Sequence, residues 1–120
     1  MSFDTSVLDR AIAERRAEWE RRRVAMLARV LAALDEIAPS FDVRRAYIFG
    51  SLARPGRYHE RSDVDIAVEW PRGKAGFFDL AGDVSRLIGQ DIDIQPLDQI
   101  PFADKIRREG ILWQQETSNF

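Results

Sequence analysis

Two aspartates, Asp63 and Asp65, are the residues of this sequence whose types and spacing are best suited to chemistry. They open the stretch DVDIAVEW, in which polar and apolar residues alternate, and such alternation predicts a strand with one buried face. Both carboxylates then point the same way, and like charges that close raise each other's pKa unless a cation lies between them. Because Mg²⁺ typically takes one or two carboxylates together with substrate phosphates, the pair predicts a magnesium site.

A Gly-Ser pair, Gly50 and Ser51, directly follows the apolar run AYIF, which predicts a strand that ends at Gly50. Glycine lets the backbone approach a ligand closely, and a helical turn that begins at Ser51 presents free N–H groups. Such groups bind phosphate, and Arg54, one turn later, can add a guanidinium. The segment therefore predicts a phosphate-binding corner near the aspartates.

Asp91 and Asp93 repeat the alternating pattern in the later segment DIDIQPL, which predicts a third strand. Either aspartate could complete a site for two metal ions about 3.5–4 Å apart, an arrangement used for in-line displacement at phosphorus. Both could equally be edge-strand charges that discourage aggregation, and a surface Asp-x-Asp is also typical of the solvated side of a strand. The residue pattern alone leaves these alternatives open.

The composition bounds the classes of protein to be considered. The chain has 120 residues, of which 45% are hydrophobic and 32% charged, as expected for one small globular domain. The absence of cysteine excludes disulfides and thiolate metal sites, and a net charge of -2 argues against a dedicated nucleic-acid binder. With no apolar run near the roughly 20 residues of a membrane span and no secretory signal pattern, we expect a cytoplasmic protein without membrane contact.

The elements that must position these residues follow from the apolar periodicity. Residues 5–38 contain no proline or glycine and predict one long helix or two abutting ones. The remaining order predicts a small α+β domain with its helices packed against one side of a mixed sheet. No element is assigned to the short apolar segment ILW that follows Gly110. The expected strands are 43–50, 63–70 and 91–97, and the expected helices after the first are 77–89 and 101–110.

The long helix has an apolar stripe that is strong at both ends and thin in the middle. The segment ERRAEWERRR offers only Trp19 and two alanines as apolar material, so we expect residues 13–23 to project beyond the core. A charge run of this kind is ordinarily a solvated face with Glu–Arg pairs three or four residues apart. The alternative is a docking surface for a partner, anchored by Trp19.

Three further residues could have either a structural or a functional role. His59, the only histidine, is interpreted as an exposed loop residue, although it could act as a base. Phe77 and Phe78 are interpreted as packing residues at the start of a helix, and the alternative is a platform on which a base stacks.

The features occur in an order that resembles a known signature. The stretch GSLARPGRYHERSDVDIAV resembles the Gly-Ser, spacer, Asp-x-Asp pattern of the DNA polymerase β-like nucleotidyltransferase superfamily. With the DID strand and a chain this short, it is most similar to the minimal nucleotidyltransferase (MNT) subgroup. The resemblance covers about residues 43–113 and implies a minimal nucleotidyltransferase domain over 39–120, preceded by a long helix over 1–38.

The resemblance also implies a set of site residues and cofactors. Two Mg²⁺ ions and ATP, as the nucleotide donor, are the implied cofactors. The third carboxylate falls on Asp93, because family members read apolar-Asp-apolar there, whereas Asp91 occupies a position that is often basic in relatives. The implied catalytic and metal-binding residues are Asp63, Asp65 and Asp93, and the implied nucleotide-binding residues are Gly50, Ser51 and Arg54.

The function that the resemblance implies is that of an antitoxin. Minimal nucleotidyltransferases of this kind are commonly paired with a HEPN-domain toxin that is a ribonuclease, and the implied reaction transfers AMP from ATP to a tyrosine hydroxyl of that toxin. One alternative is transfer to a small-molecule hydroxyl. The other is a non-catalytic binding module that covers its partner. In each case the N-terminal helix is a possible interface for a homo-oligomer or a hetero-oligomer, and no direct nucleic-acid contact is expected.

Overall fold

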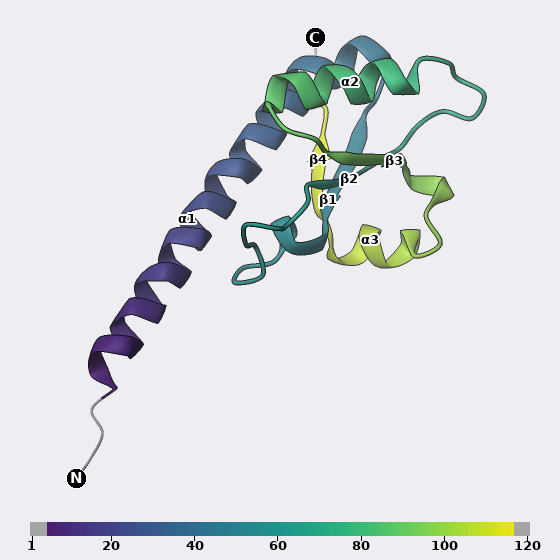
Figure 1. Ribbon diagram of the computed structural model, residues 1–120. Helices are drawn as coiled ribbons and strands as arrows, with labels where there is room; N and C mark the ends of the chain where they lie inside the picture. The colour runs from purple at the N-terminus through teal and green to yellow at the C-terminus, as the bar shows by residue number, and fades with distance from the viewer. Residues whose placement is uncertain (1–4, 117–120) are drawn as a thin grey trace.

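The computed structural model describes residues 5–116 and shows a mixed sheet with helices on both faces and one long helix that projects beyond it (Figure 1). The protein measures 69 Å along its longest axis and 30 and 29 Å along the others, because of this helix. The helices are α1 (Ser6–Ile37), α2 (Phe77–Ile88) and α3 (Ala103–Glu109), with 3₁₀ turns η1 (Ala38–Phe41), η2 (Gly50–Ala53) and η3 (Leu97–Gln99). The strands are β1 (Arg45–Phe49), β2 (Asp65–Val68), β3 (Asp93–Pro96) and β4 (Ile111–Gln114).

The four strands lie in the order β3-β2-β1-β4, which confirms the predicted mixed sheet. β1 pairs with β2 and with β4 in antiparallel fashion, and β2 pairs with β3 in parallel. The strand β4 was not predicted, because a run of three apolar residues is too short for alternation to show. It forms through its pairing with β1, in which Trp113 lies opposite Ala46.

One face of the sheet is covered by α1 and α2. Alternate strand residues such as Ile48 and Ile66 are fully buried there, against Leu34 of α1 and Leu80 of α2. As predicted, α2 ends at Gly89, whose φ of 86° is the left-handed conformation that favours glycine. This face contains the main hydrophobic core.

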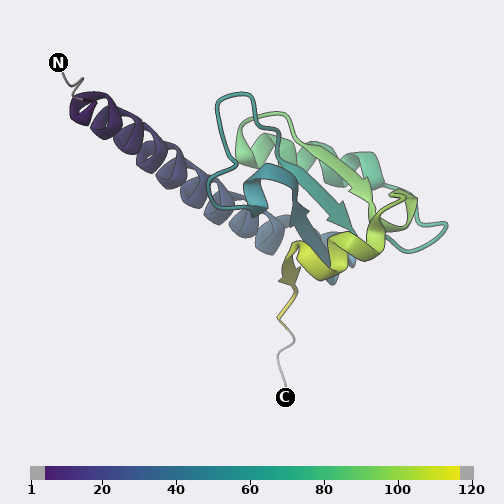
Figure 2. The same ribbon diagram turned by 90° about the horizontal axis from the view of Figure 1, so that it is seen from below.

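The opposite face differs from the prediction that all helices pack on one side. Figure 2 shows α3 across the sheet from α2, and a second, smaller core lies beneath α3. Tyr47 and Ala67 point away from the main core and need apolar cover, which α3 and η3 supply. The buried members of this second core are Tyr47, Ala67, Leu97, Ile100 and Ile106.

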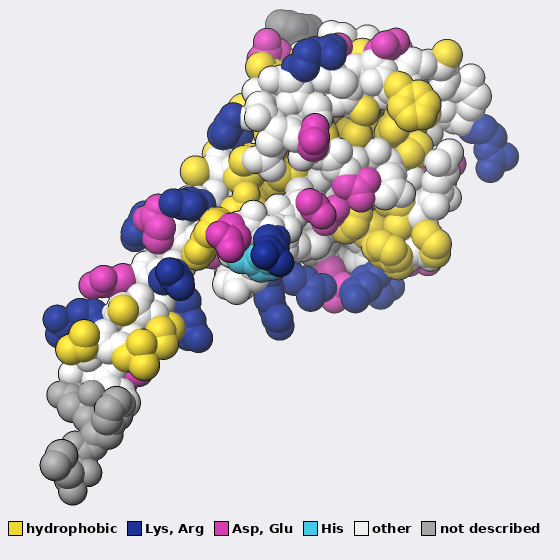
Figure 3. Space-filling view, viewed as in Figure 1, with side chains coloured by type: hydrophobic (Ala, Val, Ile, Leu, Met, Phe, Trp, Pro, Cys, Tyr) yellow, Lys and Arg dark blue, Asp and Glu magenta, His cyan; other side chains and the backbone are white. Residues whose placement is uncertain are grey.

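The prediction that residues 13–23 project beyond the core is confirmed only in part, because residues 13–17, 21 and 22 are exposed, whereas residues 18–20 are partly covered and Arg23 is buried. Trp19 is half-buried, because its ring lies edge-to-face against Tyr58 with the centroids 6.2 Å apart, and Arg23 is buried. The residues that contact the middle of α1 lie in a segment far along the chain, and helical periodicity cannot reveal such contacts. Figure 3 shows hydrophobic side chains on the protruding end, where the exposed apolar residues are Val7, Leu8 and Ile12.

Despite the length of α1, no helix within residues 5–116 is apolar enough over a sufficient length to cross a membrane.

Candidate active site

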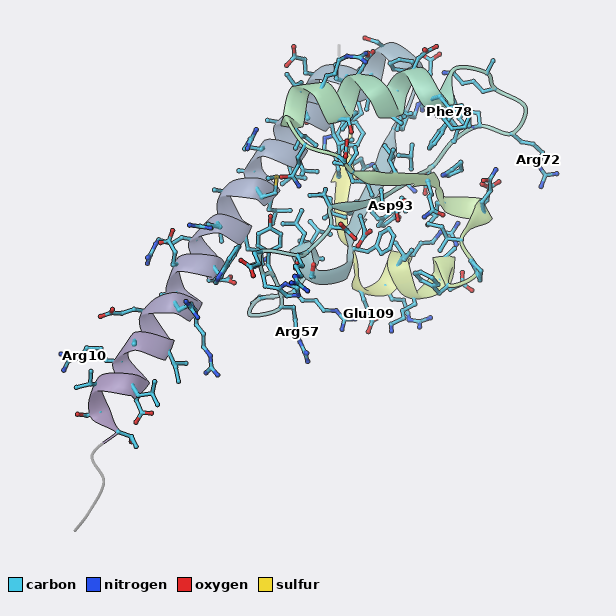
Figure 4. All side chains as sticks on the ribbon, in the orientation of Figure 1. Arg10, Arg57, Arg72, Phe78, Asp93 and Glu109 are labelled. Carbon is cyan, nitrogen blue, oxygen red and sulfur yellow. The ribbon has the colours of Figure 1, made fainter. Side chains whose placement is uncertain are left out.

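The predicted carboxylates gather at one end of the sheet. Asp65 opens β2 and lies directly across from Asp93, which opens the parallel neighbour β3 (Figure 4). The backbone N–H of Asp93 donates to the carbonyl of Val64 at 2.8 Å, which sets this register. The Asp93 carboxylate accepts a hydrogen bond from the Gln95 amide at 3.1 Å, and Asp63 lies two residues before β2. Sequence spacing and sheet pairing thus place the three aspartates at the same end of the sheet, at the start of two adjacent strands.

The charges of Asp63 and Asp93 act on Asp65. Asp65 is half-buried, whereas Asp63 and Asp93 are exposed. Burial raises the pKa of Asp65 above its ordinary value, and the negative charges of Asp93 and Asp63 raise it further. The charges that act on Asp65 are therefore those of the residues predicted as its co-ligands, and not that of Asp91.

The donor set suits a hard divalent cation in its chemistry, because all three side chains offer carboxylate oxygens. Their mutual repulsion at Asp65 is a cost that a bound cation removes. Within residues 5–116, however, no group of three or more His, Asp or Glu side chains stands close enough together to hold a metal ion. The assignment of Asp63, Asp65 and Asp93 as metal ligands stays a prediction.

Gly50 meets two structural demands at the start of η2. Its φ of 74° lies in the left-handed region, and a Cβ at this position would lie 2.5 Å from Oδ2 of Asp65. Only glycine relieves both constraints. Ser51 follows within the same turn and is half-buried. The turn, a 3₁₀ helix of four residues, therefore lies close to Asp65.

A buried arginine of α1 holds η2 in position. Nη1 of Arg23, which is 8% exposed, donates to the carbonyl of Leu52 at 3.0 Å. Its Nε and Nη2 bind the Glu20 carboxylate at 3.0 and 2.6 Å, and Glu20 also accepts the N–H of Gly56 at 3.2 Å. These bonds raise the pKa of Arg23 and lower that of Glu20. Sequence reasoning missed this network, because an arginine within a charged helical run resembles a solvated residue.

A pocket of about 280 Å³ opens beside Gly50 and Asp65, between η2 and α3. The predicted nucleotide-binding residue Arg54 lines it and is exposed. The contributions of α3 were missed, because this helix was expected on the other face of the sheet. They come from Phe102 at its N-cap, Lys105 and Glu109.

The other residues considered at the sequence level lie outside this pocket. His59 is an exposed loop residue, as interpreted, and its Nδ1 accepts the N–H of Arg61 at 3.2 Å. Phe77 packs edge-to-face on Trp70, with the ring centroids 5.3 Å apart, which confirms its packing role. Phe78 is 89% exposed, so the packing interpretation was wrong for this residue. It lies one residue beyond Phe77, about 100° further round the helix, and its ring lies edge-to-face against that of Phe77 with the centroids 6.2 Å apart.

Comparison with known proteins agrees with these features. The sequence profile of the family described as polymerase beta, nucleotidyltransferase matches residues 33–117, which include the whole candidate site. Among curated proteins, none matches the chain significantly.

Two solved structures are similar to this chain. One, classed as a minimal nucleotidyltransferase, has 28% identity and a TM-score of 0.58, and the match covers 74% of this chain and 93% of the other. The second, from Sulfolobus solfataricus and classed as a nucleotidyltransferase, has 31% identity and a TM-score of 0.53, with 80% and 86% covered. The profile match, together with these folds, shows that the chain belongs to the polymerase β nucleotidyltransferase family.

Proposed function

We propose that this protein is an Mg²⁺-dependent nucleotidyltransferase that transfers AMP from ATP to a tyrosine hydroxyl of a HEPN-domain ribonuclease toxin and so acts as an antitoxin. The observation that carries the proposal is the position of Asp65, which contacts the Gly50 turn on one side and pairs with Asp93 on the other. Family membership supports nucleotidyl transfer. The toxin and the tyrosine come from the resemblance of the sequence to antitoxins of the minimal subgroup.

In this proposal the residues of the chain bind phosphate, orient the donor and accept a proton. The tyrosine oxygen attacks the α-phosphorus of ATP, and a new O–P bond forms as the bond between the α-phosphorus and the bridging oxygen breaks. Pyrophosphate leaves with that oxygen. The backbone of Gly50 and Ser51 and the guanidinium of Arg54 hold the phosphates, and Asp93 accepts the hydroxyl proton.

Two Mg²⁺ ions would be held by Asp63, Asp65 and Asp93. When bound, the ions supply positive charge that lowers the pKa of the attacking hydroxyl and stabilises the departing pyrophosphate. The raised pKa of Asp65 supports this assignment, because a bound cation offsets both causes of the shift.

For the partner, we propose that the toxin docks on the protruding part of α1. Val7, Leu8 and Ile12 are exposed there, and an exposed apolar stripe is typical of an interaction site. Trp19 lies at the base of this region, with the Arg22 guanidinium 4.7 Å from its ring centroid. Leu8→Glu should then weaken association by about 2 kcal/mol, measured by calorimetry, with little change in the stability of the free chain.

The experiment that tests the reaction uses ATP labelled at the α-phosphate, Mg²⁺ and the product of the neighbouring gene. We expect label on the partner protein, no label from ATP labelled at the γ-phosphate, and no label with Asp65→Asn. Label on a small molecule alone would favour the small-molecule alternative. A partner that is neutralised without any label would favour the non-catalytic binding module.

A further inference from the structure

Two cations from different elements meet one carboxylate at the mouth of the pocket between η2 and α3. Nη2 of Arg54 lies 4.0 Å and Nζ of Lys105 lies 3.9 Å from the same oxygen, Oε2 of Glu109. Glu109 is labelled in Figure 4. All three side chains are about half-exposed, with 54, 57 and 51% of their surface accessible. Exposed pairs of this kind contribute about 0–1 kcal/mol each, so a stronger anion can replace the carboxylate.

The position of α3 beside η2 is fixed by Gly110. A Cβ on Gly110 would lie 2.7 Å from the carbonyl oxygen of Ile106 and 3.1 Å from that of Ile48. Only a residue without a side chain allows the end of α3 to lie this close to β1. Lys105 and Glu109 are therefore held near η2 by the packing of their helix.

The same pocket has an apolar end. Phe49 and Phe102 lie edge-to-face, with their ring centroids 6.0 Å apart, and both line the pocket together with Asp65. An apolar aromatic wall beside two cations matches the two parts of a nucleoside triphosphate, a flat base and a polyanion. The volume of about 280 Å³ is close to that of the smaller ligand sites of proteins.

We infer that Lys105 and Arg54 bind the polyphosphate of the donor nucleotide, and that Glu109 holds both cations until the polyphosphate displaces it. The inference rests on the proposed function and deepens it, because it makes α3 part of the donor site. A triphosphate carries more negative charge than one carboxylate and offers several acceptor oxygens, so it competes for both cations.

The test measures binding to the full chain by calorimetry in EDTA, with tripolyphosphate, ATP, AMP and adenosine as separate ligands. Lys105→Gln should lower the affinity for tripolyphosphate and for ATP about tenfold, because one charge-assisted contact is lost. The affinity for adenosine should not change. Glu109→Gln should raise the affinity for tripolyphosphate and for ATP several-fold, because the competing carboxylate is removed. Arg108→Gln is the matched control, because it removes the same charge from an exposed position on α3 that does not line the pocket.

Three results would overturn the inference. The first is a parent chain that does not bind tripolyphosphate. The second is a change in tripolyphosphate affinity on Lys105→Gln that is no larger than the change on Arg108→Gln. The third is a loss of tripolyphosphate affinity on Glu109→Gln that equals the loss on Lys105→Gln. That result would show that Glu109 orients the cations and does not compete for them. Neither metal nor acceptor is present in these titrations, so their outcome is independent of label transfer, and failure of the proposed function is detected separately.

Discussion

The two faces of the sheet are built in different ways. The face beneath α1 and α2 is closed, and its strand residues, such as Ile48, Ile66 and Val68, are fully buried among apolar side chains. On the other face, α3 covers the centre, over Tyr47 and Ala67, and leaves the carboxylate end of the sheet partly exposed. The closed face supplies the stability of the domain, and the partly open face bears charges that lower it.

This difference explains why unfavourable features can persist at the site. Asp65 is half-buried near two other negative charges, and Gly50 adopts a left-handed conformation against it. The half-buried charge at Asp65 costs stability, and the apolar core on the opposite face offsets that cost. The left-handed conformation itself costs little, because Gly50 has no Cβ. Substitutions on the closed face should therefore change stability, and those on the open face should change binding or reaction.

The largest effect is expected on the closed face. Leu34→Ala should lower the free energy of unfolding by about 2–5 kcal/mol, because the side chain is fully buried and its removal leaves a cavity. Chemical denaturation measures the loss. Leu87→Ala on α2, where the side chain is 44% exposed, is the matched control and should cost much less. Equal losses at the two positions would contradict the account of this face.

On the open face, Asp63→Asn combined with Asp65→Asn should abolish the rise in melting temperature caused by Mg²⁺ with ATP. A ligand at 100 times its Kd stabilises the folded state by about 2.7 kcal/mol, and the variant should lose this contribution while it stays folded. Asp79→Asn with Asp83→Asn, on α2, removes the same charge on the other side of the sheet and should keep the full shift. A double variant at the site that responds like the parent would disprove the assignment.

Substitution of Gly50 tests whether a close contact with Asp65 adds to the cost of a side chain at a positive φ. Gly50→Ala and Gly73→Ala both place a side chain at a positive φ, 74° and 78°, which costs about 1–2 kcal/mol. At Gly73 no atom lies within 4 Å of the new Cβ, whereas at Gly50 it meets Asp65 at 2.5 Å. Gly50→Ala should therefore lower the unfolding free energy by about 1 kcal/mol more. Identical losses would show that the turn does not press on Asp65.

The smallest expected effect is the dependence of stability on pH at Asp65. Because folding raises the pKa of this carboxyl, its favourable contribution is present at low pH and is lost as the pH rises through the raised value. Asp65→Asn should thus be more stable than the parent at pH 7, by less than about 1 kcal/mol for a partly solvated group. The gain should shrink as the pH falls toward about 4, where the parent carboxyl is also protonated. A gain that grows toward low pH would reverse the sign and contradict the account.

Local spacing was sufficient to predict the parts of the site that lie near one another in the chain. The period of two on β2 places Asp63 and Asp65 together, and the end of an apolar run at Gly50 marks the turn. The choice of Asp93 over Asp91 came from the family resemblance. The parallel register, in which Asp93 lies across from Asp65, agrees with that choice.

Features that depend on contacts between distant segments could not be predicted in the same way. Trp19 is half-buried because Tyr58, in a loop 39 positions later by sequence number, packs against it. Arg23 is buried because the carbonyl of Leu52 accepts its hydrogen bond. The side of the sheet on which α3 lies decides whether Lys105 belongs to the site, and no local pattern indicates that side.

The central claim is that Asp93, across from Asp65, completes the catalytic group, and one paired measurement tests it directly. The rate of transfer from α-labelled ATP to the partner protein is compared for the parent, Asp93→Asn and Asp91→Asn. Asp93→Asn should lower the rate by at least about 100-fold, the scale of a lost acid–base group, while Asp91→Asn stays close to the parent. Loss of transfer in Asp91→Asn with full activity in Asp93→Asn would contradict the account.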